Sequence, residues 1–132
     1  MKDLIDTIYT HDRHCKSVTF NGLTNEIEIT VDCISRIRDP SGEWNFYTQE
    51  DIDDGILVFS GIQSFSMIPQ GVMPNDFIYL KKVKGKDKKA AQYCIFLGHC
   101  DDQGNVSTIE MNIISNQFYL KDPKKPLVQI KK

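Results

Sequence analysis

The sequence predicts one mainly β (α+β) domain, residues 1–132, in which about six to eight antiparallel strands form a single curved sheet or open barrel. Apolar and polar residues alternate from Glu26 to Cys33, which is the pattern of a half-buried strand. Glycine and asparagine recur between the apolar segments, as hairpin turns require. A chain of 132 residues with 40% hydrophobic residues is also long enough to bury a core without disulfides or metals.

The N-terminal part of the chain predicts a short helix and then a hairpin. The apolar residues of LIDTI at 4–8 have the spacing of one helical face, which predicts a helix over residues 2–9. Val18 and Phe20 precede the alternating strand, and the connecting NGLTN at 21–25 supplies residues that tolerate a positive φ. We therefore expect these two strands to pair antiparallel.

The middle of the chain is expected to leave the sheet and return to it. RDPSGEW at 38–44 is typical of a turn, because its proline fixes one dihedral angle and its glycine frees another. TQEDIDDG at 48–55 predicts one helical turn that ends at its glycine. ILVFSGIQSFSMIP at 56–69 predicts a strand with a bulge or bend near Gly61.

The C-terminal half predicts three further strands. FIYLKKV at 77–83 forms one of them, and the charged KGKDKK that follows is expected at a hairpin tip. In QYCIFLGHC at 92–100 both alternating sets are largely apolar, so this strand is expected to be central and covered on both faces. Gly104 turns the chain, and VSTIEMNIIS at 106–115 returns; FYL and PLVQI then add a short closing segment.

The net charge of −2 hides an asymmetry along the chain. Residues 1–60 contain five basic and twelve acidic side chains (5 − 12 = −7), whereas residues 61–132 contain eleven and six (11 − 6 = +5). A folded sheet can interleave the two halves, so two solvated surfaces that partly neutralise each other are favoured over a functional dipole. No apolar segment approaches the ~20 residues of a membrane span, and the acidic N-terminus does not resemble a signal peptide. We therefore expect a cytoplasmic protein without membrane contact.

Eleven lysines in the second half are the best argument for nucleic-acid binding. This half has no arginine, the usual base-reading residue, and no ladder of exposed aromatic residues is interleaved with the lysines. Lysines at hairpin tips and edge strands commonly keep a protein soluble and block edge pairing. Nucleic-acid binding is therefore kept only as a weak second alternative, through Lys81, Lys82, Lys84, Lys86, Lys88, Lys89, Lys121, Lys124, Lys125, Lys131 and Lys132.

Two short stretches, HDRHC and GHC, contain residues that commonly bind metals. On a regular strand, however, His99 and Cys100 point to opposite faces, and Cys94 lies ~20 Å from Cys100 at ~3.3 Å per residue. The chain has no Cys-x-x-Cys motif. We therefore expect no cofactor, and no common metal site among His11, His14, Cys15, His99 and Cys100.

Catalytic motifs are missing from the sequence. It contains no glycine-rich phosphate loop, no nucleophile elbow, and no carboxylate pair set in a helical or strand register. The thiol of Cys15 and the ring of His14 diverge if both lie on a strand. The sequence therefore predicts a protein that is not an enzyme.

The segment LIDTIYTHDRHCKSVTFNGLTNEIEITVDCI, followed by DGILVFSGIQSF, resembles small bacterial β domains that include immunity proteins of polymorphic toxin systems. In these domains a His-Asp pair near the N-terminus leads into a hairpin, and a Phe-x-Gly-hydrophobic strand follows. The resemblance covers the first half to two-thirds of the chain. It implies that His11 and Asp12 fix the start of the first strand, and that the domain binds a partner protein.

The acidic excursion between the strands is the predicted partner-binding surface. Aromatic anchors flanked by carboxylates suit a basic protein partner, because buried Trp and Tyr supply contact area and the acids steer the encounter. The alternative is that Trp44 is a core residue and that the acids only solvate a loop. The predicted residues are Glu43, Trp44, Tyr47, Glu50, Asp51, Asp53 and Asp54.

A competing prediction is a small-molecule-binding barrel. A closed sheet could hold an apolar molecule between Trp44, Phe59, Phe77 and Phe96, although aromatic residues at such positions are more often ordinary core residues. A cavity of several hundred Å³ would favour this alternative over a filled interior. The sequence defines neither the ligand nor an oligomeric state.

Overall fold

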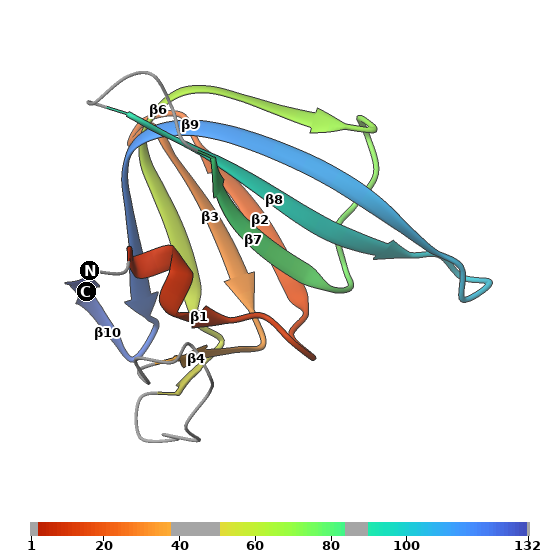
Figure 1. Cartoon of the computed structure of the whole chain (residues 1–132), viewed down its shortest axis with the longest axis horizontal. Coiled ribbons are helices and arrows are strands. Elements are labelled where there is room, and N and C mark those ends of the chain that lie inside the picture. Colours follow the sequence, from red (N-terminus) through yellow and green to blue (C-terminus); the bar gives the residue numbers. More distant parts are fainter. Residues whose placement is uncertain (1–2, 38–50, 84–89, 132) are drawn as a thin grey trace.

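The computed structural model describes residues 3–37, 51–83 and 90–131, and within them two antiparallel sheets surround one core (Figure 1). The described residues form one 3₁₀ turn, η1 (Leu4–Thr7), and ten strands. The strands are β1 (Ile8–Tyr9), β2 (Cys15–Asn21), β3 (Glu26–Val31), β4 (Cys33–Arg36), β5 (Ile52–Asp53), β6 (Ile56–Ile68), β7 (Ile78–Val83), β8 (Ala91–Cys100), β9 (Val106–Asp122) and β10 (Lys125–Ile130).

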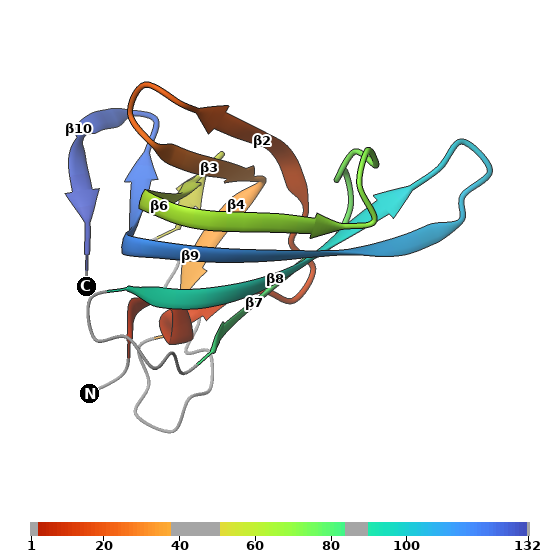
Figure 2. The same ribbon diagram turned by 90° about the horizontal axis from the view of Figure 1, so that it is seen from above.

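The larger sheet has seven strands, in the order β2-β3-β6-β9-β8-β7, with β10 paired to β9. The long strand β9 organises this sheet, because one of its edges pairs with β6 while the other pairs first with β8 and then with β10. The strands β6, β9 and β8 run side by side, and the β8–β9 hairpin projects beyond the rest of the molecule (Figure 2). The smaller sheet has the order β1-β4-β5.

The larger sheet curls until its two edge strands almost meet. An isolated antiparallel bridge joins His14, just before β2, to Phe77, just before β7. The Cys15 N–H donates to the Asp76 carbonyl at 2.7 Å next to that bridge. Among the described residues β2 and β7 make no other ladder contact. The sheet is therefore open along a seam between β2 and β7, and it does not close into a barrel.

The concave side of the larger sheet forms the hydrophobic core. Alternate residues of its central strands are fully buried, among them Ile29, Ile95 and Ile113, and burying such a side chain contributes roughly 1.5–3 kcal/mol each. The 3₁₀ turn η1 lies at one end of this core, where Ile5 is buried. The strand at 92–100 is thus central, between β7 and β9, and the strand at 106–115 faces the core, as predicted. Cover on both faces of the strand at 92–100 is found only in part, because Phe96 on its other face is half-buried.

Several predicted turns are found as expected. The hairpin between β2 and β3 is antiparallel, and Asn25 in its turn has φ 57°. Gly104, between β8 and β9, has φ 82°, a region in which glycine is unstrained. Gly61 has φ 67°, and the register of β6 against β9 shifts between Ile62 and Ser64. The predicted bulge in this strand is therefore confirmed.

The predicted N-terminal helix over residues 2–9 is wrong. Only Leu4–Thr7 is helical, as a single 3₁₀ turn whose N-cap makes no side-chain hydrogen bond. Ile8 and Tyr9 instead pair with β4. The spacing of three apolar residues is compatible with a helix and also with a tight turn followed by a strand. A helix of eight residues gains little stability from its own hydrogen bonds.

The fold prediction needs three further corrections. The helical turn predicted at 48–55 is wrong where the structure describes it, because Ile52–Asp53 pairs with β4 as the strand β5. The described residues form ten strands instead of six to eight, and they form two sheets instead of one. The turn predicted at 38–44 and the charged hairpin tip after β7 lie outside the described residues. No helix among the described residues has the length and apolar character needed to cross a membrane.

Candidate functional site

An apolar groove of about 310 Å³ runs beside the free edge of β2. Its walls come from β2, from the end of β6 and from the loop that leads to β7. The groove therefore lies on the open seam, next to the bridge that joins its two edges. The lining residues are Lys16, Ser17, Val18, Phe20, Met67, Gly71, Val72, Met73 and Pro74.

The wall formed by β2 presents side chains that point toward the inside of the sheet. Val18 and Phe20 lie opposite Ile29 and Ile27, which are fully buried, and residues opposite each other share a face. In the described part of the chain no strand flanks β2 on its outer side, and Phe20 remains 49% exposed. Its ring stacks on that of Phe65, with 5.1 Å between the ring centroids.

The opposite wall is the loop segment 71–74, which β8 holds in place. The His99 Nδ1–H donates to the Met73 carbonyl at 2.6 Å. The Asn75 side chain donates to the Cys100 carbonyl at 3.1 Å and accepts from the Cys100 N–H at 2.7 Å. The structure thus gives His99 and Cys100 a shared structural role, which is to anchor one wall of the groove.

The end of the groove at Lys16 is acidic. The Lys16 ammonium forms an ion pair with Asp54, and Asp53 beside it is exposed. Asp32 accepts hydrogen bonds from the His14 N–H and ring, at 3.0 and 3.1 Å. Partial burial raises the pKa of Asp32, but these hydrogen bonds outweigh it and the pKa lies below its ordinary value. The carboxylates of Asp32, Asp53 and Asp54 outnumber the nearby cations, Lys16 and Arg13, so this end carries a negative charge.

The apolar lining of the groove can bury apolar groups of a bound molecule, and the thiol that lies next to the groove is not reactive. The neighbouring thiol of Cys15 is buried, and burial raises its pKa to about 11. A thiol with such a pKa is a poor nucleophile at neutral pH. The described residues contain no group of three or more His, Cys, Asp or Glu side chains arranged to hold a metal ion.

The predicted partner-binding residues are only partly described. Glu43, Trp44, Tyr47 and Glu50 lie outside the described residues. Asp51 is partly buried, whereas Asp53 and Asp54 are exposed at β5 and its turn. Asp54 meets the groove through its ion pair with Lys16, so the acidic surface and the groove are contiguous there.

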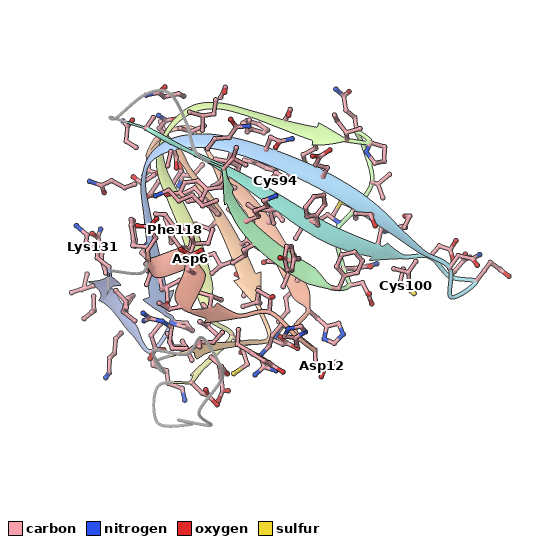
Figure 3. The ribbon with its side chains drawn as sticks, viewed as in Figure 1. Asp6, Asp12, Cys94, Cys100, Phe118 and Lys131 are labelled. Carbon is pink, nitrogen blue, oxygen red and sulfur yellow. The ribbon has the colours of Figure 1, made fainter. Side chains whose placement is uncertain are left out.

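The histidines and cysteines do not gather at one place. The His11 ring packs on Tyr9, with 5.2 Å between the ring centroids, whereas the rings of His14 and His99 engage Asp32 and Met73. Figure 3 shows the two cysteines of β8 far apart along that strand, one over the sheet and the other near the projecting hairpin.

Those aromatic residues proposed for a barrel cavity that the structure describes do not line one cavity. Phe59 is fully buried in the core, where its ring contacts those of Tyr93 and Phe118. Phe96 lies on the other face of the sheet, between two fully buried residues of β8, and its ring is 6.3 Å from that of Tyr79. Trp44 lies outside the described residues. The apolar groove of about 310 Å³ lies at the seam and is lined by none of these residues.

Among the lysines of the second half, two that the structure describes form ion pairs. Lys82 contacts Asp3 at 2.8 Å, and Lys121 contacts Glu28 at 3.5 Å. Four lysines of the run, at positions 84 to 89, lie outside the described residues. The described lysines that belong to β7, β9 and β10 are therefore spread over several strands and do not line the groove.

Sequence reasoning missed the residues of the groove. Val18 and Phe20 belong to the strand predicted before NGLTN, and Met67 belongs to the strand predicted at 56–69. The alternation around Val18 and Phe20 indicates only that this segment is extended, with one apolar face. Nothing local shows that β2 is an edge strand, since this depends on which distant segment pairs with it.

The fold and the groove define an antiparallel β domain whose curled sheet leaves an apolar seam open beside an acidic turn. The chain belongs to the Family of unknown function (DUF6258), which it matches over residues 1–132. Neither the curated proteins nor the solved structures contain a match to it.

Proposed function

We propose that this chain is a non-catalytic binding domain that holds a partner protein in the apolar groove and at its acidic end. The observation that supports the proposal is the exposed, stacked pair of Phe20 and Phe65 beside an open groove. Large apolar side chains that gather at one exposed place commonly mark an interaction site. Aromatic residues are also the side chains that contribute most to binding energy at protein interfaces.

Charge supports a partner with basic groups. Lys16 lines the groove and forms an ion pair with Asp54. Asp53 and Asp32 lie near this ion pair. An acidic surface accelerates the encounter with a basic partner and makes binding sensitive to salt. An immunity-type role, in which the partner is a toxin that this domain neutralises, is the specific form of the proposal.

A small apolar molecule is the second candidate for the groove. The volume of about 310 Å³ is at the lower end of the ~300–1,000 Å³ that ligand pockets occupy. Apart from Lys16 and Ser17, the lining residues are apolar or glycine, as in such pockets.

Site-specific photo-crosslinking tests which partner occupies the groove. A photoreactive amino acid replaces Phe20 in the full chain expressed in its native host, and mass spectrometry identifies the adduct. The matched control carries the same amino acid at Tyr79, which is about as exposed (51% against 49%) but lies away from the groove. We expect one protein adduct from position 20 that is missing from position 79.

Other outcomes of this experiment are equally informative. An adduct below about 1 kDa at position 20 alone would support the small-molecule candidate. The same adducts from both positions, or none from either, would contradict a role for this groove.

A further inference from the structure

Among the described residues, the outer edge of β2 has main-chain groups without a main-chain partner along the groove wall. The Val31 N–H donates to the Gly55 carbonyl, on the side of β3 that faces β6. Main-chain groups of a strand point alternately to its two sides. The main-chain groups of Ile29 and Ile27 therefore also face β6, as those of Val31 do. Val18 and Phe20 lie opposite these two residues, so their N–H and C=O groups point to the outer side of β2.

These outward groups have no main-chain partner among the described residues. Past Cys15, whose N–H donates to the Asp76 carbonyl, no main-chain hydrogen bond joins the outer edge of β2 to another described segment. The side chains of Val18 and Phe20 meanwhile face the groove. One stretch of β2 thus offers both a free strand edge and apolar contacts, which is the combination that a bound β-strand uses.

We propose that the occupant of the groove is an extended segment of the partner protein that pairs with the outer edge of β2 and fills the open seam. This inference rests on the proposed function and specifies its partner. Backbone pairing at Val18 and Phe20 supplies hydrogen bonds that any sequence can make. Side chains at every second position of the added strand then enter the groove against Met67 and Val72.

The charges at the end of the groove specify one further feature of the segment. The strand edge begins next to Asp32, which accepts from His14, and the Lys16 side chain reaches Asp54 on the other side of β3. A lysine or arginine at that end of the bound segment complements the excess negative charge. The segment is therefore extended, apolar at alternate positions and basic at one end.

Two variants at one position isolate the backbone contribution. Val18→Pro removes the outward N–H, and proline is tolerated on an edge strand where the N–H faces away from the ladder. Val18→Ala removes most of the same side chain but keeps the N–H. Circular dichroism and the urea midpoint of both variants verify that the sheet remains folded.

The probe is a phage-displayed library of random twelve-residue peptides, selected on the immobilised full chain. We expect enriched peptides with apolar residues at every second position and a basic residue near one end. Fluorescence anisotropy of the enriched peptides should give a Kd at least tenfold weaker for Val18→Pro than for Val18→Ala, and weaker binding at high salt.

The controls separate this inference from the proposed function. Peptides that lose affinity with Phe20→Ser but bind Val18→Pro and Val18→Ala equally would leave the groove as a binding site and overturn strand addition. Enrichment of no peptide, or of peptides insensitive to Phe20→Ser, would overturn strand addition as well. Photo-crosslinking at position 20 then decides independently whether the groove binds a protein at all.

Discussion

The ring of His99 on β8 donates a hydrogen bond of 2.6 Å to the main-chain carbonyl of Met73. This contact joins the projecting β8–β9 hairpin to the loop that forms one wall of the apolar groove. A residue selected from the sequence as a possible metal ligand therefore determines the shape of the groove instead. The same loop continues into Asn75 and Asp76, whose N–H groups both donate to the Gly98 carbonyl.

Replacing His99 by Ala should loosen this wall. Loss of one hydrogen bond costs about 1 kcal/mol, which corresponds to about a fivefold increase in local opening. We expect hydrogen exchange of the Asn75 and Asp76 amides to accelerate by about that factor, measured by NMR. The control His11→Ala removes a ring that packs on Tyr9 and should leave these two amides unchanged. Unchanged exchange in His99→Ala would show that the wall does not depend on this contact.

Asp32 should contribute an acid-sensitive part of the stability. Because its folded pKa lies below its ordinary value of 3.8, the contribution is present above about pH 4 and is lost as the pH falls through the folded pKa. We expect Asp32→Asn to be less stable than the wild type at pH 7, and this difference to shrink toward pH 3. Urea unfolding between pH 3 and pH 7 measures it. A difference that stays constant with pH would contradict the assignment.

Tyr119 should contribute at the opposite end of the pH scale. Burial, and then the hydrogen bond from its hydroxyl to Glu26 at 2.7 Å, raise the pKa of Tyr119 from 10.0 to about 12. A raised folded pKa stabilises the protein below about pH 10, and this contribution is lost as the pH rises toward about 12. We expect Tyr119→Phe to lose about 2 kcal/mol of unfolding free energy at pH 8. The loss should be smaller at pH 11 in the same urea experiment, and an equal loss at both pH values would contradict the prediction.

Gly98 should tolerate no side chain. A Cβ atom at this position would lie 2.5 Å from the ring of Phe77 and 2.9 Å from the Cβ of Asp76, at the bridge that joins the edges of the sheet. Such overpacking costs about 1–3 kcal/mol, so the thermal midpoint of Gly98→Ala should fall. Gly22→Ala is the matched control, because nothing lies within 4 Å of its Cβ and its effect should stay within about 0.5 kcal/mol. Equal midpoints of the two variants would contradict the crowding.

Local patterns in the sequence determined most of the strands. The alternation from Glu26 to Cys33 describes β3 because the period of two is a property of the extended backbone. The positive φ of Asn25 and Gly104 was predictable because only a few residue types tolerate that region. The N-terminal residues were misassigned, since Leu4–Thr7 forms one 3₁₀ turn and a spacing over so few residues fits more than one local structure.

The tertiary structure alone decided where the candidate site lies. Val18 and Phe20 belong to an edge strand, and the groove beside them exists because the bridge between His14 and Phe77 is the one ladder contact between β2 and β7 among the described residues. Both facts come from pairing between segments that are distant in sequence. Local propensity determines that a segment is extended, but the partner on each of its edges is chosen by the packing of the whole chain.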